Sequence, residues 1–232
     1  MIRKSLAAIG LSAAMATTLI AGCSAPANDP NVSNQSEQQR QNVDKSQYKL
    51  DITESGYSID GSGYVHYAMT LKNDMPDGAM FPVLKITGKD AAGNVVFADE
   101  QTLLDVQPGA TTAWAGQAGN GTAPDTVEFS VSVSETNWTT SEKPAELEVV
   151  NSSANDSGYG TVDFVGEVKN NSNETVDQAA LIVILRNDAG EIVGGYNGFT
   201  NNVPANGTTA FDVLGYEVPE YSKMDVIALD WL

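Results

Sequence analysis

The chain has 232 residues, of which 30 are acidic and 12 are basic, so its formal net charge at pH 7 is −18. A surface with this charge repels nucleic acid and anionic lipid headgroups, which excludes DNA and RNA as partners. A single cysteine excludes an intramolecular disulfide, so each domain must be stabilised by core burial alone. Abundant Gly, Asn, Asp, Ser and Thr favour strands joined by tight turns over helices.

The N-terminal segment combines a basic start at residues 1–4 with an apolar run over residues 6–21. This is the layout of a secretory signal, and the run is too short to span a bilayer as a permanent helix. Residues 19–23 read LIAGC, which resembles the lipobox of bacterial lipoproteins. The resemblance implies cleavage between Gly22 and Cys23 and a diacylglyceryl group on Cys23. A plain signal peptide followed by an incidental cysteine is the alternative.

Removal of residues 1–22 would change the net charge to −20 and make Cys23 the new N-terminus. Two or three acyl chains there would anchor the protein stably, because each buried methylene contributes about 0.8 kcal/mol. We therefore expect the membrane as a partner through the lipid on Cys23. The expected location is the outer leaflet of the cell membrane, facing the cell exterior, and a Gram-positive envelope is favoured.

Residues 24–47 contain almost no apolar side chains and are rich in Ser, Asn and Gln. A segment of this composition cannot offset its ordering entropy by burial. Residues 23–47 are therefore predicted to form a disordered tether.

From Tyr48 onward the chain repeats itself at a constant offset of 97 residues. Three ungapped blocks share this register: 64–73 with 161–170, 90–96 with 187–193, and 111–114 with 208–211. Agreement of three blocks in one register indicates a duplicated domain. We expect the first domain at 48–134, a linker at 135–146 and the second domain at 147–232.

Within each copy the apolar residues alternate with a period of two, as in Val65, Tyr67, Met69 and Leu71. Residues 90–94 and 187–191 supply hairpin turns whose glycines can take positive φ. Strands separated by such turns predict an all-β fold of two tandem antiparallel β-sandwiches, each immunoglobulin-like.

Part of the second copy resembles a known domain family. Residues 164–170 (FVGEVKN), 188–190 (DAG) and 206–211 (NGTTAF) are similar to the FxLYD-type immunoglobulin-like domains of bacterial envelope proteins. The match covers about 55 residues and is more degenerate in the first copy. The strand that names the family keeps only its Leu, within VILRN at residues 183–187. The resemblance implies this fold and no active site.

Residues suited to catalysis or metal binding are scarce. The one histidine, His66, faces solvent by strand parity, without the partners that a zinc site or a nucleophile pair needs. Asn155–Asp156 and Asn187–Asp188 are interpreted as turn formers, with calcium ligation as the alternative. We expect no catalytic residue, no metal and no cofactor, and hence no enzyme.

One apolar strip breaks the symmetry between the copies. Outward-facing Ala180, Ile182 and Ile184 replace Val83, Lys85 and Thr87 of the first copy, and Val165 is expected on the same face. Either another part of the chain covers this strip, which is the favoured explanation, or the strip is a docking surface for an envelope protein.

These features predict a membrane-anchored surface lipoprotein that displays a non-catalytic binding or structural module. The alternative is an accessory or regulatory subunit of an envelope enzyme or transporter, recruited through the second copy. A hydrolase is a third hypothesis, which an aromatic content of 7% disfavours because a glycosidase cleft needs aromatic walls.

Overall fold

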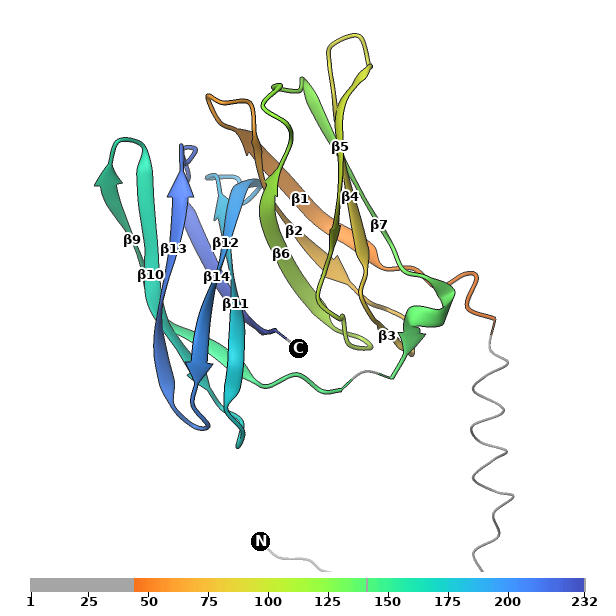
Figure 1. Cartoon of the computed structure of the whole chain (residues 1–232), viewed down its shortest axis with the longest axis vertical. Helices are drawn as coiled ribbons and strands as arrows, with labels where there is room; N and C mark the ends of the chain where they lie inside the picture. The colour runs from red at the N-terminus through yellow and green to blue at the C-terminus, as the bar shows by residue number, and fades with distance from the viewer. Residues whose placement is uncertain (1–43, 141, 232) are drawn as a thin grey trace, which may run out of the picture. The chain divides into compact units, whose positions relative to one another are not determined.

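The computed structural model describes residues 44–140 and 142–231. The predicted signal segment, Gly22, Cys23 and most of the tether lie outside the described residues. Residues 44–232 form one compact unit built almost entirely of strands (Figure 1). Among the described residues, no helix has the length and hydropathy needed to cross a membrane.

The first half of this unit is a sandwich of two antiparallel three-stranded sheets, in the orders β1-β2-β6 and β5-β4-β7. Its main strands are β1 (Asp51–Ile59), β2 (Val65–Lys72), β4 (Val83–Lys89), β5 (Val95–Thr102), β6 (Thr111–Ala118) and β7 (Thr126–Ser132). A short pair joins β3 (Gly78–Ala79) to β8 (Trp138–Thr139), which follows the 3₁₀ helix η1 (Glu135–Asn137). Inward-facing Val65, Tyr67, Met69 and Leu71 are buried in the core, as their alternation predicted.

The second half repeats this arrangement, with sheets in the orders β13-β10-β9 and β12-β11-β14. Its strands are β9 (Leu147–Gly158), β10 (Thr161–Asn170), β11 (Val176–Arg186), β12 (Ile192–Val203), β13 (Thr208–Tyr216) and β14 (Lys223–Asp230). The all-β sandwich architecture is therefore confirmed.

Two buried asparagines show the duplication at the level of single hydrogen bonds. Asn73 and Asn170 are 97 residues apart, and both are fully buried. Each donates from Nδ2 to two carbonyl oxygens at 2.8–3.1 Å: those of Asp77 and Val106 for Asn73, and those of Glu174 and Val203 for Asn170. Every partner is itself shifted by 97 residues, so the two sandwiches share both topology and internal bonding.

One turn motif occurs three times in the part of the chain that the structure describes. Asp60, Asp90 and Asn187 each accept hydrogen bonds with Oδ1 from the backbone amides two and four residues later, at 2.8–3.0 Å. A glycine follows three residues after each of them, with φ between +83° and +86°. The predicted hairpin turns at 90–94 and 187–191 are thus present, and they require glycine at that position.

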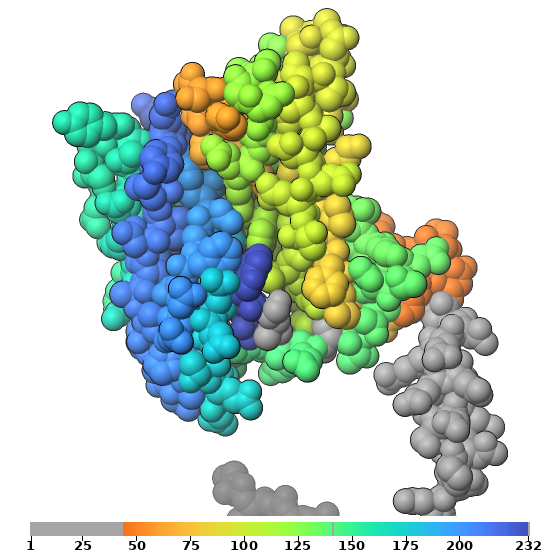
Figure 2. Space-filling view, viewed as in Figure 1, coloured from red at the N-terminus to blue at the C-terminus, as the bar shows by residue number. Residues whose placement is uncertain are grey.

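The two sandwiches pack face to face. The outer face of sheet β1-β2-β6 lies against the outer face of sheet β12-β11-β14, so four sheets are stacked in sequence. Figures 1 and 2 show the second sandwich, coloured from teal to blue, lying along the first, coloured from orange to green. The two central sheets are covered on both faces, which is why β2 and β11 are buried along almost their whole length.

The edges of the folded unit differ from the predicted boundaries. Lys45, which belongs to the predicted tether, forms an ion pair with Asp77 at 2.8 Å and donates to the carbonyl of Trp138. Trp138, in the predicted linker, is 2% exposed and meets Tyr48 edge to face. Both segments therefore contribute to the first sandwich.

Candidate functional site

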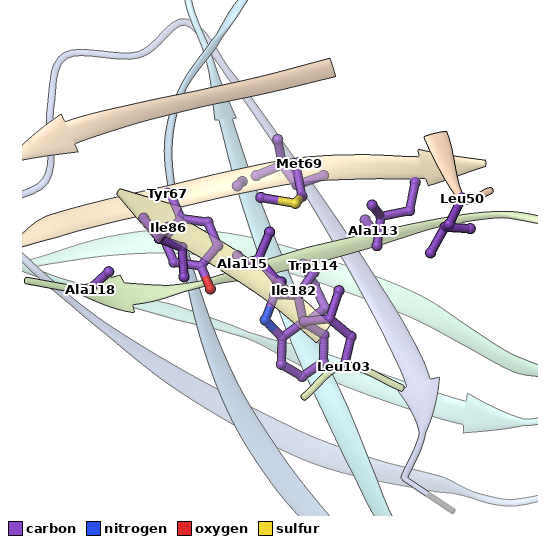
Figure 3. Close-up of a cluster of buried hydrophobic side chains, with 14 of the residues drawn as sticks. Leu50, Tyr67, Met69, Ile86, Leu103, Ala113, Trp114, Ala115, Ala118 and Ile182 are labelled. Atoms are coloured by element: carbon purple, nitrogen blue, oxygen red, sulfur yellow. The ribbon is translucent and has the colours of Figure 1, made fainter. Parts of the chain in front are cut away.

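The apolar strip of the second sandwich is buried in the junction between the sandwiches. Ala180, Ile182 and Ile184 are at most 1% exposed. Ile182 and Ile184 belong to the same apolar cluster as Ala68 and Ala115 of the first sandwich. Figure 3 shows Ile182 and Ala115 in this cluster. Another part of the chain, the first sandwich, therefore covers these residues, and they cannot serve as an exposed docking surface.

Val165 does not belong to this strip, contrary to the prediction. It lies on β10, in the sheet on the other side of the second sandwich, and is half-buried there. The period of two correctly placed Val165 on an outer face. It could not tell which of the two sheets carries that face, because both sheets of a sandwich obey the same alternation.

Small residues allow the two sheets to approach closely at the junction. A Cβ atom on Gly195 would lie 2.5 Å from the Cβ atom of Ala68, and one on Gly56 would lie 1.8 Å from the carbonyl oxygen of Ile192. Contacts this short are prohibited, so glycine is needed at both positions.

His66 is buried, so the prediction that it faces solvent is wrong. Its side chain does point away from the core of the first sandwich, but the second sandwich covers that face and leaves His66 only 4% exposed. Nε2 lies 3.0 Å from Oδ2 of Asp60, and the ring lies 5.0 Å from that of Tyr196. The amide of Gly61 donates to the carboxylate of Glu217 beside this cluster.

The group formed by His66, Asp60 and Tyr196, which we call the His66 cluster, contains one largely buried carboxylate, that of Asp60. Burial opposes ionisation of Asp60, but bonds from the amide of Tyr64, from His66 and from the amide of Ser62 outweigh it, so the pKa of Asp60 is lowered. Burial raises the pKa of the Tyr196 hydroxyl, which donates to the carbonyl of Tyr216 at 2.9 Å.

The variant Asp60→Asn tests the contribution of this charge to stability. Asparagine maintains the turn, because Asn187 forms the same turn in the second sandwich. A carboxylate with a lowered pKa stabilises the fold above its unfolded pKa, near 3.8, and this contribution disappears as the pH falls through the folded pKa. We expect Asp60→Asn to unfold at lower urea concentration than the wild type at pH 7.

The difference between the two proteins should shrink as the pH is lowered below about 4. Asp90→Asn measures what the turn bonds alone contribute, because Asp90 occupies the same turn motif outside the junction and its pKa is also lowered, by hydrogen bonds from Asn94. A constant difference between wild type and Asp60→Asn over pH 2–7 would contradict this account.

An ion-pair group connects the sandwiches at another edge. Arg186 of β11 bonds Glu54 of the first sandwich at 2.8 Å and Asp225 of β14 at 3.1 Å. Hydrogen bonds and ion pairing with Glu54 raise the pKa of Arg186, and burial does not reverse this. The junction thus has an apolar centre with charged and polar groups at its rim.

A cleft of about 270 Å³ opens at the junction where the connecting segment passes between the sandwiches. We call it the junction cleft. Four segments line it: residues 104–107 and 110–112 of the first sandwich, residues 144–147 of the connecting segment, and residues 228–230 of β14. Asp230 accepts a hydrogen bond from the amide of Ala145 at 2.8 Å, which ties the connecting segment to the second sandwich.

The wall of the junction cleft is mostly apolar, and its ionisable side chains are all acidic. Leu104, Leu147 and Leu229 are partly buried apolar side chains of its wall, and no lysine or arginine is among the described residues that line the cleft. Asp105, Glu146 and Asp230 supply the carboxylates. This combination suits a ligand that has an apolar body and a positive charge.

The connecting segment separates this cleft from a second, more polar hollow of about 740 Å³. Residues 142–146, 171–177 and 230–231 line the hollow. Trp231 lies at its edge, 6.1 Å from Trp114 in a stacked arrangement and 5.0 Å from Phe199 edge to face. Trp231 and Phe199 are both more than one-third exposed, so an aromatic surface adjoins the polar hollow.

The sequence did not predict the junction cleft, because the segments that line it lie far apart in the chain, at residues 104–112, 144–147 and 228–230. One signal was present: Leu104 replaces the polar Asn201 found at the equivalent position of the second copy. An apolar residue at a position that is polar in its repeat can mark a surface with an added role.

In each of the two loops considered for calcium, one of the two named side chains bonds within its own turn. Asp156 accepts from the amide of Gly158 at 2.7 Å, and Asn187 caps its own turn. No group of three or more metal-binding side chains occurs among the described residues.

Comparison with known proteins identifies no relative by sequence. No protein-family profile and no curated protein matches the chain. A solved structure that resembles it is the C-terminal globular domain of an oligosaccharyltransferase from Pyrococcus abyssi. The similarity covers 78% of this chain and 46% of that one, with 6% identity and a TM-score of 0.25.

Proposed function

We propose that the chain is a lipid-anchored protein of the bacterial envelope whose two joined β-sandwiches form a non-catalytic binding module. The observation that carries the binding role is the junction cleft, an apolar hollow with carboxylates in its wall. Support for the anchor comes from the sequence, since residues 19–23 resemble a lipobox.

The ligand of the cleft is proposed to be an apolar group with a positive charge, such as an alkylammonium group or a lysine side chain among apolar neighbours. The apolar wall would be covered on binding, which is favourable by roughly 25 cal/mol per Å². The net charge of −18 would attract cations to the cleft and raise their association rate.

Binding is tested with 4-phenylbutylammonium as the probe and 4-phenylbutanol as its uncharged counterpart, by titration followed in NMR spectra. The cation should bind in the millimolar range, as expected for a ligand of this size, and at least about tenfold more tightly than the alcohol. Shifts should centre on the amides of residues 104–107 and 145–147.

Thr111→Trp should abolish binding, because Thr111 is exposed and lines the cleft. Thr126→Trp is the matched control, since Thr126 is equally exposed on β7 and does not line the cleft. Equal binding of cation and alcohol would contradict the ligand class. Unchanged binding in Thr111→Trp would contradict the site.

The anchor is tested separately with Cys23→Ser. Without a thioether-linked lipid, the protein should move from the membrane fraction to the soluble fraction. The intact mass of the wild type should show acyl chains on an N-terminal Cys23. A wild-type protein without acyl chains, or a cleaved variant that stays in the membrane fraction, would refute the anchor and leave the cleft proposal unaffected.

A further inference from the structure

The contact between the two sandwiches is head-to-tail. The first sandwich uses the sheet β1-β2-β6, whereas the second uses β12-β11-β14, which corresponds by the 97-residue offset to β5-β4-β7. The two buried faces are therefore different faces of the repeated unit. A contact of this kind does not close on itself and can in principle continue from one copy to the next.

At each end of the stack, the exposed outer sheet face is therefore equivalent, by the 97-residue offset, to a face that is buried at the junction. At one end is the outer face of β9-β10-β13, which we call the acidic end face. At the other end is the outer face of β5-β4-β7, which we call the lysine end face. Both faces have the same strand pairing as the buried faces to which they correspond.

The acidic end face differs from its buried counterpart by added charge. In the first sandwich, Ala68 of β2 is paired with Ala115 of β6. The equivalent pair in the second sandwich is Val165 with Asp212. His66 and Thr70 are likewise replaced, by Asp163 and Glu167. At these three positions the buried face has no carboxylate, whereas its own rim carboxylates, Glu54 and Asp60, are replaced by Asn151 and Ser157.

The lysine end face has lost the apolar centre of its buried counterpart. Ile182 is paired with Ile227 at the junction, whereas the equivalent pair is Lys85 with Ser130. Leu229 corresponds to Ser132, and Gly195, which permits close approach, corresponds to Ala98. Lys85, Ser130, Ser132 and Ala98 are all exposed.

We propose that both end faces are modified copies of the buried interface, and that their polar and charged side chains prevent a second copy of this chain from extending the stack. In the geometry seen at the junction, Lys85 of a second copy would take the place of Ile182 and lie against Val165 and Asp212, and Asp163 and Glu167 would be covered as well. Burying Lys85 together with three carboxylates costs more than the ion pair and the remaining apolar contact could return. The stack therefore ends at two sandwiches.

The proposal is tested by restoring the buried-face residues on one end at a time. The acidic-face variant carries Asp163→His, Val165→Ala, Glu167→Thr and Asp212→Ala. The lysine-face variant carries Lys85→Ile, Thr87→Ile, Ala98→Gly, Ser130→Ile and Ser132→Leu. Both are made in residues 23–232 with Cys23→Ser, so that no lipid contributes to association.

Each variant alone should sediment as a monomer, because its other end face still blocks addition. An equimolar mixture should form a complex of twice the mass, and a chain that carries both sets should form longer assemblies with rising concentration. The wild type should stay monomeric under all these conditions. The measurement is sedimentation velocity, with circular dichroism to show that each variant is folded.

A second pair of variants makes smaller changes, in case the first pair fails to fold. One chain carries Asp163→Asn, Glu167→Gln and Asp212→Asn, and the other carries Lys85→Met. These changes keep side-chain size and should produce weaker but measurable pairing. Folded variants of both designs that stay monomeric in the mixture would overturn the proposal. Self-association of the wild type through these faces would overturn it as well.

Discussion

The variant Ile182→Asn is expected to lower the free energy of unfolding by about 4 kcal/mol. Ile182 is fully buried and contacts an apolar cluster that includes side chains of the first sandwich. The change removes apolar contacts and places a carboxamide in this apolar cluster. Urea unfolding followed by tryptophan fluorescence measures the effect.

Lys85→Asn is the matched control, because Lys85 occupies the equivalent position of the first copy and is exposed. Its effect should stay within about 0.5 kcal/mol, as for most surface changes. If the junction forms as described, both sandwiches should unfold in one transition in the wild type. Similar, small effects of Ile182→Asn and Lys85→Asn would show that the junction does not form in solution.

Much of the fold could be predicted because its determinants are local. Alternation with a period of two placed the core residues, and the Asx–Gly turns placed the hairpins. The 97-residue offset then carried the assignment from one copy to the other. The same determinants decide strand order only indirectly, so Val165 was assigned to the wrong sheet.

The junction could be predicted only in part. The contrast between Ile182 and Lys85 showed that one outer face had changed character, which is a property of the sequence. What covers that face depends on how two separate domains meet, and no local pattern records this. His66 illustrates the limit, since its parity was correct and its exposure was not.

The candidate site was the least predictable part. The junction cleft is built by four segments from residue 104 to residue 230, and it exists only because the sandwiches are joined at a particular angle. The pKa of Arg186 is raised chiefly by its hydrogen bond to Glu54, which is 132 residues away in the sequence. These effects follow from packing and require the structure.

The variants Asn73→Ala and Asn170→Ala are each expected to cost about 3 kcal/mol. Each removes two donated bonds, so that one buried carbonyl (of Val106 or Val203) and one partly buried carbonyl (of Asp77 or Glu174) lose that partner. Oδ1 of each also accepts a backbone amide, from Met75 and Ser172 respectively, at 2.9 Å. Because the bonding is duplicated, the two costs should be similar.

Asn171→Ala is the control, since Asn171 is an exposed neighbour with one long side-chain contact of 3.4 Å to Glu148. It should change stability by no more than about 0.5 kcal/mol. The pair of variants also reports on the junction. If the sandwiches unfold together, either substitution should shift the single transition of the whole molecule. If they unfold independently, Asn73→Ala should shift one of two transitions and Asn170→Ala the other, which would contradict a structure in which the two cores are joined through Ile182 and Ile184.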